Sequence, residues 1–217
     1  MQTGQIEKAE MDGYYGHARV EVLPFLPADI RRIADIGGSS GATLTAIKAR
    51  WPDATTICID SHEPSLEQSR RRGHIAVACD LDNNIPDVVK DCDVVMLLDV
   101  LEHLVDPWSV LRKVVQLVPR GATVIVSVPN VRYWEVSFGL LFRGRWELRD
   151  AGVLDRTHLR FFTHDSGADL IRGAGLTLRA TTANLAGGRR YALLDRVTLG
   201  IMSDFLRSQY LYVCTKE

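Results

Sequence analysis

The chain has 217 residues, of which 46% are hydrophobic and 24% charged, ordinary values for one globular domain. A formal net charge of −1 excludes the strongly basic balance of proteins whose main partner is nucleic acid or an anionic membrane. No apolar run reaches the roughly 18 residues of a membrane span, and the polar N-terminal stretch lacks the apolar core of a signal peptide. We therefore expect a cytoplasmic protein that does not bind membranes.

Short apolar runs and helical segments alternate through the first 129 residues. Five strands are predicted, at Ile33–Ile36, Thr55–Ile59, Ile75–Cys79, Asp93–Leu98 and Ala122–Val128. Helices are predicted at Gly16–Leu26, Ala42–Arg50, Pro64–Arg72 and Trp108–Val118. Such alternation indicates a parallel sheet with helices on both of its faces.

The last third of the sequence departs from this alternation. Residues Val131–Phe162 are rich in Arg, Trp and Phe and show a poor helical pattern, so we interpret them as an insertion above the carboxyl edge of the sheet. A helix is predicted at Asp165–Ala174, and an apolar helix is an option at Leu193–Phe205. Two further strands, Leu176–Thr181 and Ser208–Thr215, are predicted to pair antiparallel. We expect one domain over residues 1–217, with an N-terminal helical cover over about 1–30 and the insertion over about 131–162.

The four cysteines, Cys58, Cys79, Cys92 and Cys214, have spacings that match no zinc motif. Three of them lie in or beside strand-like runs, where a reduced thiol packs as a small hydrophobe. We expect no structural disulfides, and because no His, Cys and Asp residues cluster at metal-ligand spacing, we also expect chemistry that needs no metal.

A glycine-rich turn, IADIGGSSGAT at Ile33–Thr43, separates the first strand from the next helix. Gly37 and Gly38 allow a tight turn and close approach to a ligand, and the N–H groups of the helix point toward that place. The dinucleotide fingerprint G-x-G-x-x-G is absent, since Ser39 stands where its second glycine would be. The alternative is a turn that is tight for structural reasons alone.

Acidic residues end the second and third strands. Asp60, with Ser61 beside it, lies roughly 20 residues after the turn, where a carboxylate can accept hydrogen bonds from both ribose hydroxyls. Asp80, followed by Leu81, could bind an adenine amino group and pack on its ring. Either aspartate could instead cap a helix or a turn.

The fourth strand ends in the polar cluster of DVVMLLDVLEHLVDP, Asp93–Pro107, which contains Asp99, Glu102 and His103. The carboxyl edge of an open α/β sheet is where ligands bind. Together with GGSSG, the acidic strand ends and LVPRGATVIVSVPN, this segment resembles the class I S-adenosylmethionine-dependent methyltransferases. The likeness runs from about Tyr14 to the C-terminus, and the segment VRYWEVSFGLLFRGRWELRDAGVLDRTHLRFFT resembles a subgroup of MetW-like and small glycan or natural-product methyltransferases.

The resemblance implies a Rossmann-like, seven-stranded, mostly parallel sheet and S-adenosylmethionine as cofactor. It also implies roles by position: Asp35 would organise the turn, Gly37, Gly38 and Ser39 would contact the methionine and ribose parts, and Asp60 would hold the ribose diol. Asp80 and Leu81 would hold adenine, Asp99 would lie beside the methionine part, and Tyr15 would close over the cofactor. Tyr15 could equally be a packed aromatic residue.

Two histidines are candidates for a general base, which an alcohol acceptor needs. His103 follows the fourth strand, and its alternative role is to hydrogen-bond the start of the next helix together with Glu102. His158 lies in LDRTHLRFFT, where Asp155, Arg156, His158 and Arg160 would put alternating charge on a strand-like segment. The alternative for this segment is a salt-bridged lid that fixes the insertion to the sheet.

Arg132, Tyr133 and Trp134 follow the fifth strand directly and are predicted, with Arg160, to contact the acceptor. Arginine suits an anionic acceptor, and Trp134 and Trp146 suit a sugar or a flat ring. The same stretch could instead be a homodimer surface, since Arg and Trp are enriched at interface hot spots.

Three functions are compatible with these features. The first is methyl transfer to a small polar metabolite, such as a sugar, a glycan precursor or a natural-product intermediate, with O-methylation favoured over N-methylation. The second is a MetW-like accessory protein that binds a metabolic enzyme. The third, a nicotinamide-dependent enzyme, is disfavoured by the missing glycine spacing and by DVLEHL.

Overall fold

A computed structural model of the chain describes residues 18–185, 195–200 and 202–217. Seven strands form one sheet in the order β3-β2-β1-β4-β5-β7-β6. Their bounds are β1 Arg32–Ile36, β2 Thr55–Asp60, β3 Ile75–Ala78, β4 Val94–Leu98, β5 Thr123–Pro129, β6 Leu176–Leu185 and β7 Arg207–Lys216. The five strands β1 to β5 pair in parallel, whereas β7 is antiparallel to both β5 and β6. The predicted mostly parallel, Rossmann-like sheet with an antiparallel C-terminal pair is confirmed.

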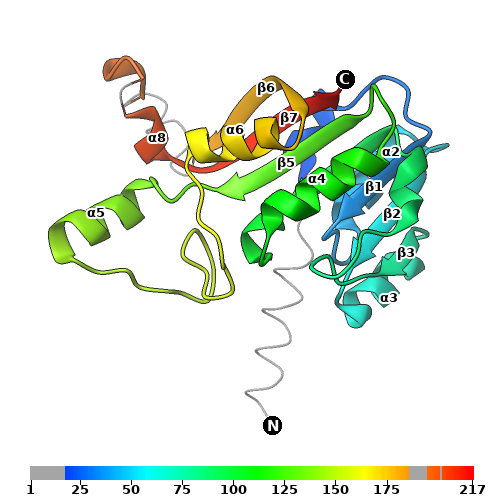
Figure 1. Cartoon of the computed structure of the whole chain (residues 1–217), viewed down its shortest axis with the longest axis horizontal. Helices are drawn as coiled ribbons and strands as arrows, with labels where there is room; N and C mark the ends of the chain where they lie inside the picture. Colours follow the sequence, from blue (N-terminus) through cyan, green and yellow to red (C-terminus); the bar gives the residue numbers. More distant parts are fainter. Residues whose placement is uncertain (1–17, 186–194, 201) are drawn as a thin grey trace, which may run out of the picture.

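Helices connect the parallel strands (Figure 1). The α-helices are α2 Ala42–Arg50, α3 Glu63–Arg71, α4 Pro107–Leu117, α5 Trp134–Arg143, α6 His164–Gly173 and α8 Ser203–Leu206, and the 3₁₀ helices are η1 Val20–Phe25, η2 Asp87–Asp91 and η3 Leu101–His103. Local chemistry fixes several of their starts. Asp106 accepts a hydrogen bond from Ser109 N at the start of α4, where Pro107 supplies the first turn, and Thr163 and Ser166 form a capping box on α6.

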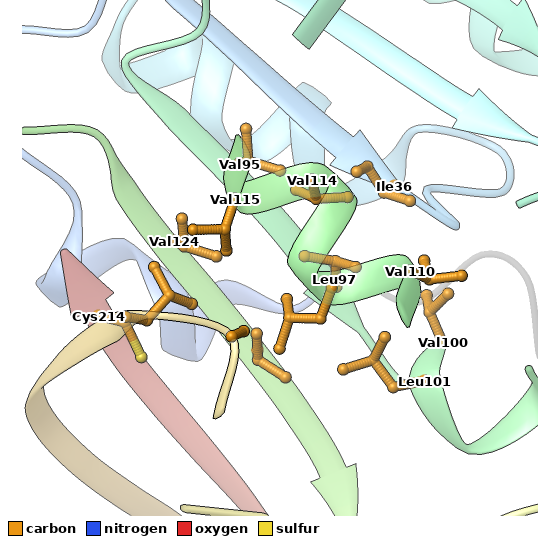
Figure 2. Close-up of a cluster of buried hydrophobic side chains, with 14 of the residues drawn as sticks. Ile36, Val95, Leu97, Val100, Leu101, Val110, Val114, Val115, Val124 and Cys214 are labelled. Atoms are coloured by element: carbon orange, nitrogen blue, oxygen red, sulfur yellow. The ribbon is translucent and has the colours of Figure 1, made fainter. Parts of the chain in front are cut away.

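The central strands are buried on both faces because successive side chains point to opposite sides. On one face, Val95 and Leu97 of β4 pack with Val110 and Val114 of α4, a cluster that Figure 2 shows beneath that helix and that extends to Ile171 of α6. On the other face, residues of β1, β2 and β4 pack against α2 and α3 in a second core cluster: Ile33, Cys58, Val94, Met96, Leu44, Ile47 and Leu66. The predicted helix layers on both faces are therefore present.

The insertion after β5 differs from the prediction in two respects. Residues Trp134–Arg143 form a regular helix, α5, although we expected a poor helical pattern, and in Figure 1 this helix extends away from the sheet. Aromatic residues recur along α5 at four-residue intervals, a helical signal that the surrounding Arg-rich sequence obscures. Residues 155–160 are turns and irregular chain instead of the strand-like segment we expected, because their backbone bonds go to local turns and to η3.

Other boundaries agree with the predictions to within a few residues. The N-terminal helical cover is described only from residue 18, where the 3₁₀ helix η1 occupies Val20–Phe25 and contains Pro24. Of the apolar helix expected at Leu193–Phe205, the described part contains α8. All four cysteines are free thiols. Among the described residues, none of the helices is both long and apolar enough to cross a membrane.

Candidate active site

The glycine-rich turn lies where the carboxyl ends of β1 and β2 meet. Gly37 N and Gly38 N both donate to Ile59 O, at 2.7 and 3.2 Å, which ties the turn to the end of β2. Gly37 has a φ of +75°, and a Cβ at this position would lie 2.2 Å from Val100 Cγ2. Glycine is therefore required here both by the left-handed backbone and by the close packing of Val100.

Ser39 and Asp60 join the two strand ends through a direct hydrogen bond. Ser39 N donates to Asp60 Oδ2 at 2.8 Å, and His62 N donates to Asp60 Oδ1 at 2.8 Å. Each carboxylate oxygen thus accepts one backbone N–H and keeps a further lone pair, a state suited to accepting a pair of hydroxyl groups. Ser61, which was predicted beside Asp60 in the site, is exposed there.

Ser39 itself has an uncommon environment. Its φ of +49° lies in the left-handed region, and its Oγ is buried without a hydrogen-bond partner among the described residues. A buried hydroxyl in this state is suited to a polar ligand group. The serine that replaces the expected glycine therefore leaves the turn intact and adds one donor.

Asp35, at the carboxyl half of β1, is almost fully buried. Burial raises the pKa of its carboxyl to about 7, with a smaller push from the negative charge of Asp60 and an opposing pull from Arg19. The predicted role of Asp35, organising the turn, agrees with its place two residues before Gly37 and remains a prediction.

Asp80 lies in the loop after β3, and its side chain accepts from Asp82 N at 3.1 Å and Asn83 Nδ2 at 2.7 Å. Leu81 is buried in the core cluster beside it. Asp80 therefore caps this turn, as the alternative interpretation predicted. These hydrogen bonds do not prevent a contact with adenine, which remains a prediction.

Asp99 directly follows β4 and has a φ of +57°. Its carboxylate accepts from Ser127 Oγ at 2.9 Å, from Gln209 Nε2 and from the guanidinium of Arg19. Arg19 is itself paired with Glu21, so that it lies in a largely buried charged network. Burial alone would lower the pKa of Arg19, but the two carboxylates outweigh it and raise that pKa.

Glu102, His103 and His158 form a second polar cluster just past β4. Leu159 N and Arg160 N donate to Glu102 O at 2.8 and 3.0 Å, which fixes the insertion against η3. The imidazole rings of His103 and His158 consequently lie 4.7 Å apart between centroids. Burial raises the pKa of Glu102 well above its ordinary value, with Asp99 adding to the effect, and burial lowers the pKa of His158.

A family model described as a methyltransferase domain matches residues 8–181, and the strand order and glycine turn agree with it. The chain belongs to the class I S-adenosylmethionine-dependent methyltransferases. A methyltransferase from Thermotoga maritima has the same fold, with a TM-score of 0.67 at 15% identity, covering 98% of this chain and 96% of its own. The predicted cofactor, S-adenosylmethionine, follows from this membership.

Two curated relatives match shorter stretches of this methyltransferase. The trans-aconitate 2-methyltransferase of Rhodococcus jostii is 32% identical over 46% of this chain and 39% of its own length. The malonyl-[acyl-carrier protein] O-methyltransferase of Xylella fastidiosa is 39% identical over 25% of this chain and 19% of its own length. The matched part thus spans less than half of either relative.

The residues at the strand ends fit S-adenosylmethionine. Asp60 offers free lone pairs for a diol, Ser39 Oγ is a buried hydroxyl without a partner, and Arg19 is a cation beside Asp99. Sequence reasoning missed Arg19, because nothing in the polar N-terminal stretch indicates that this arginine pairs with a residue 80 positions away. Tyr15 lies outside the described residues.

The four residues predicted to contact the acceptor lie in different surroundings. Arg132 forms an ion pair with Asp204 at 2.6 Å and stacks over Phe205, and Arg160 donates to the carbonyls of Leu159 and Val105. Trp134 is partly exposed at the start of α5. Tyr133 lines a hollow of about 110 Å³ between α5 and the segment that follows it, whose charged lining residues are Glu135, Arg143, Arg145, Glu147 and Arg149.

Proposed function

We propose that this methyltransferase transfers the methyl group of S-adenosylmethionine to a small polar metabolite, such as a sugar, a glycan precursor or a natural-product intermediate. O-methylation is favoured over N-methylation. The observation that carries the proposal is the pair of hydrogen bonds that Asp60 accepts from Ser39 N and His62 N, where the ends of β1 and β2 meet. The Asp60 carboxylate keeps lone pairs for a ribose diol.

Different residues of the site bind different parts of the cofactor. In this proposal Asp60 and Ser61 accept the ribose hydroxyls, Asp80 and Leu81 hold adenine, and Ser39 with Gly37 and Gly38 lies along the ribose and methionine parts. Arg19 is held at Asp99, and its guanidinium can pair with the methionine carboxylate while Asp99 accepts from the amino group.

The cofactor supplies an electrophilic methyl group on a sulfonium. The protein must align the acceptor and keep water out. An alcohol acceptor must also lose a proton, and we assign the promotion of this step to the cluster of Glu102, His103 and His158, whose ligand atoms lie within 4.8 Å of one another. Asp99 lies close enough for its charge to act on both Glu102 and His158, so the cluster and the methionine end of the cofactor share one electrostatic environment.

Two further observations support a polar, oxygen-bearing acceptor. The hollow beside α5 is lined by Arg143 and by two ion pairs, Arg145–Glu147 and Arg149–Glu135, a polar lining suited to a hydroxyl-rich molecule. One curated relative is named as an O-methyltransferase. Arg132 and Arg160, which lie outside this lining, are also assigned to the acceptor in this proposal.

Calorimetric titration with S-adenosylmethionine and its demethylated product tests the cofactor site. We expect Asp60→Asn to weaken binding by about tenfold or more, since it removes the charge that accepts the ribose hydroxyls. Asp53→Asn is the matched control, because Asp53 is exposed just before β2, at the opposite end of the same strand. Equal affinity in both variants, or no binding by the unaltered protein, would contradict the proposal.

The acceptor is tested by incubating the protein with S-adenosylmethionine and a panel of sugars, hydroxylated rings, carboxylic acids and amines. Formation of the demethylated cofactor, followed by mass spectrometry, identifies an accepted class. The methyl chemical shift of the product then separates an O-methyl from an N-methyl group. Turnover of amines alone would overturn the preference for oxygen.

The exposed apolar face of α5 favours a second candidate, an accessory protein that binds a metabolic enzyme, or a homodimer through the same face. Leu141 and Phe142 are 76% and 69% exposed, and Phe138 is 46% exposed. Replacing Leu141 and Phe142 by serine should abolish self-association or capture of a partner in gel filtration without changing cofactor affinity. Transfer activity of the isolated monomer would exclude a purely accessory role.

A further inference from the structure

Three potential metal ligands from two distant parts of the chain meet past the end of β4. Glu102 and His103 belong to η3, and His158 comes from the insertion. One ligand atom of each lies within 4.8 Å of the others. Ligand atoms that share an ion at bonds of about 2.1 Å lie about 3 to 4 Å from one another. Small changes of side-chain torsion would bring the three atoms from their present distances into this range.

The carboxylate of Glu102 has an unusual environment. The residue is 1% exposed, and neither carboxylate oxygen has a hydrogen-bond partner within the described residues. Buried carboxyl groups are normally paired or bind metal ions. The cluster thus contains an acidic group that the described protein leaves without a partner and that faces two imidazoles.

Both imidazoles have Nδ1 beside a backbone carbonyl oxygen. His158 Nδ1 lies 3.1 Å from Val153 O, and His103 Nδ1 lies 3.3 Å from Thr157 O. A carbonyl oxygen only accepts, so Nδ1 carries the proton in each ring and Nε2 keeps its lone pair. Thr157 Oγ1 also contacts His103 Nδ1 and donates to Asp155. Backbone carbonyls that hold Nδ1–H are the usual outer-shell partners of metal-binding histidines.

We propose that Glu102, His103 and His158 bind one divalent transition-metal ion of the zinc class, with positions left open for an acceptor oxygen. Two imidazoles and one carboxylate are a ligand set of catalytic zinc and related ions, whereas magnesium and calcium prefer oxygen ligands. The proposal rests on the proposed methyl transfer and assigns the means by which the acceptor is activated.

In this proposal the ion binds the acceptor hydroxyl and lowers its pKa, as zinc does for bound water. The O–H proton passes to solvent, the acceptor oxygen forms the new bond to the methyl carbon, and the sulfur leaves as a neutral thioether. The acceptor class is therefore an alcohol or a phenol. This replaces our expectation of metal-independent transfer, which rested on ligand spacing along the sequence.

The test uses the full chain without a histidine tag, stripped with a chelator and dialysed against Zn²⁺. We expect about one bound zinc per chain by elemental analysis, and a visible absorption band typical of low-coordinate Co²⁺ when Co²⁺ replaces it. Glu102→Gln and His158→Ala should each weaken zinc binding by about tenfold or more in competition with a chelating dye. His164→Gln is the matched control, because His164 lies on the surface of α6 beside Asp165 and should leave binding unchanged.

If a variant fails to fold, the measurements on the unaltered protein still decide the test. Binding of one Zn²⁺ per chain, together with the Co²⁺ absorption band, supports the site. Absence of binding, or equal binding by all variants, would overturn it. Cofactor titrations separate the two proposals. Cofactor binding without metal binding defeats this inference alone, whereas metal binding without cofactor binding defeats the proposed methyl transfer and, with it, the acceptor-activating role of the ion.

Discussion

The imidazole rings of His103 and His158 meet edge to face, 4.7 Å apart between centroids and at an interplanar angle of 74°. No local element joins these residues. The contact exists because Leu159 N and Arg160 N both donate to the carbonyl of Glu102, which brings the insertion onto η3. The same two bonds therefore bring the two candidate catalytic histidines together beside Glu102.

Glu102 should reduce stability when no cation is bound. We expect Glu102→Leu to raise the free energy of unfolding by about 1 to 3 kcal/mol in the presence of a chelator, because it removes a buried polar group without a partner. Urea denaturation measures the change. The same variant should lose transfer activity. A destabilised variant would show that the carboxyl is satisfied in the folded protein, and Glu67→Leu on the exposed face of α3 serves as the control.

Arg19 should contribute to both stability and cofactor affinity. Arg19→Gln breaks the pairs with Asp99 and Glu21, whose side chains are at most one-third exposed, and should lower the free energy of unfolding by about 1 to 3 kcal/mol. Calorimetry should show at least about tenfold weaker S-adenosylmethionine binding, because the cation for the methionine carboxylate is lost.

The control for this change is Arg31→Gln. Arg31 also pairs with an aspartate, Asp93, but its side chain is 88% exposed, so we expect a stability change within about 0.5 kcal/mol. Equal effects of the two substitutions would mean that the Arg19 network is no stronger than an ordinary surface pair.

Sequence reasoning correctly predicted which strand ends are neighbours. Register pairs Ile36 of β1 with Ile59 of β2, so that the turn after one strand and Asp60 after the other must be neighbours. Periodicity alone gave both strands, and the parallel connection then placed their ends at one edge. The Ser39–Asp60 hydrogen bond is a consequence of that register.

Other parts of the site depend on tertiary contacts that no local sequence pattern predicts. Arg19 reaches Asp99 from the N-terminal segment, and His158 reaches His103 through backbone bonds to η3. The helix α5 is different, because Trp134, Phe138 and Phe142 stack in sequence along it and recur every four residues. That spacing is a helical signal which was present in the sequence and was overlooked.

Ser39 tests whether the turn prefers glycine. Ser39→Gly removes both the left-handed strain of a side chain at φ +49° and the buried hydroxyl, and should raise the free energy of unfolding by about 1 kcal/mol. Ser39→Ala removes only the hydroxyl. Comparing the two by urea denaturation separates backbone strain from the unpaired group. If the hydroxyl contacts the cofactor, both variants should bind S-adenosylmethionine more weakly, and unchanged affinity would assign the serine no role in binding.

Asp35 should make stability depend on pH. Its pKa of about 7 in the folded protein exceeds the ordinary value of about 3.9, so the folded state holds a proton that the unfolded state has lost over this interval. The Asp35 contribution is therefore most favourable below pH 4 and is lost as the pH rises toward 7, by at most about 4 kcal/mol. Burial lowers the pKa of His74, which therefore makes stability increase with pH. The pH dependence of the unfolding free energy of the unaltered protein thus contains contributions from both residues.

The isosteric change Asp35→Asn isolates the carboxyl. The difference in unfolding free energy between this variant and the unaltered protein should be small at pH 4 and should grow in favour of the variant up to about pH 7. Urea denaturation at several pH values measures it. A difference that stays constant with pH would mean that Asp35 ionises normally in the fold, which would require it to be solvated or paired more closely with Arg19 than the structure shows. A pH-dependent difference would instead identify Asp35 as a group whose burial makes the stability of the fold sensitive to pH.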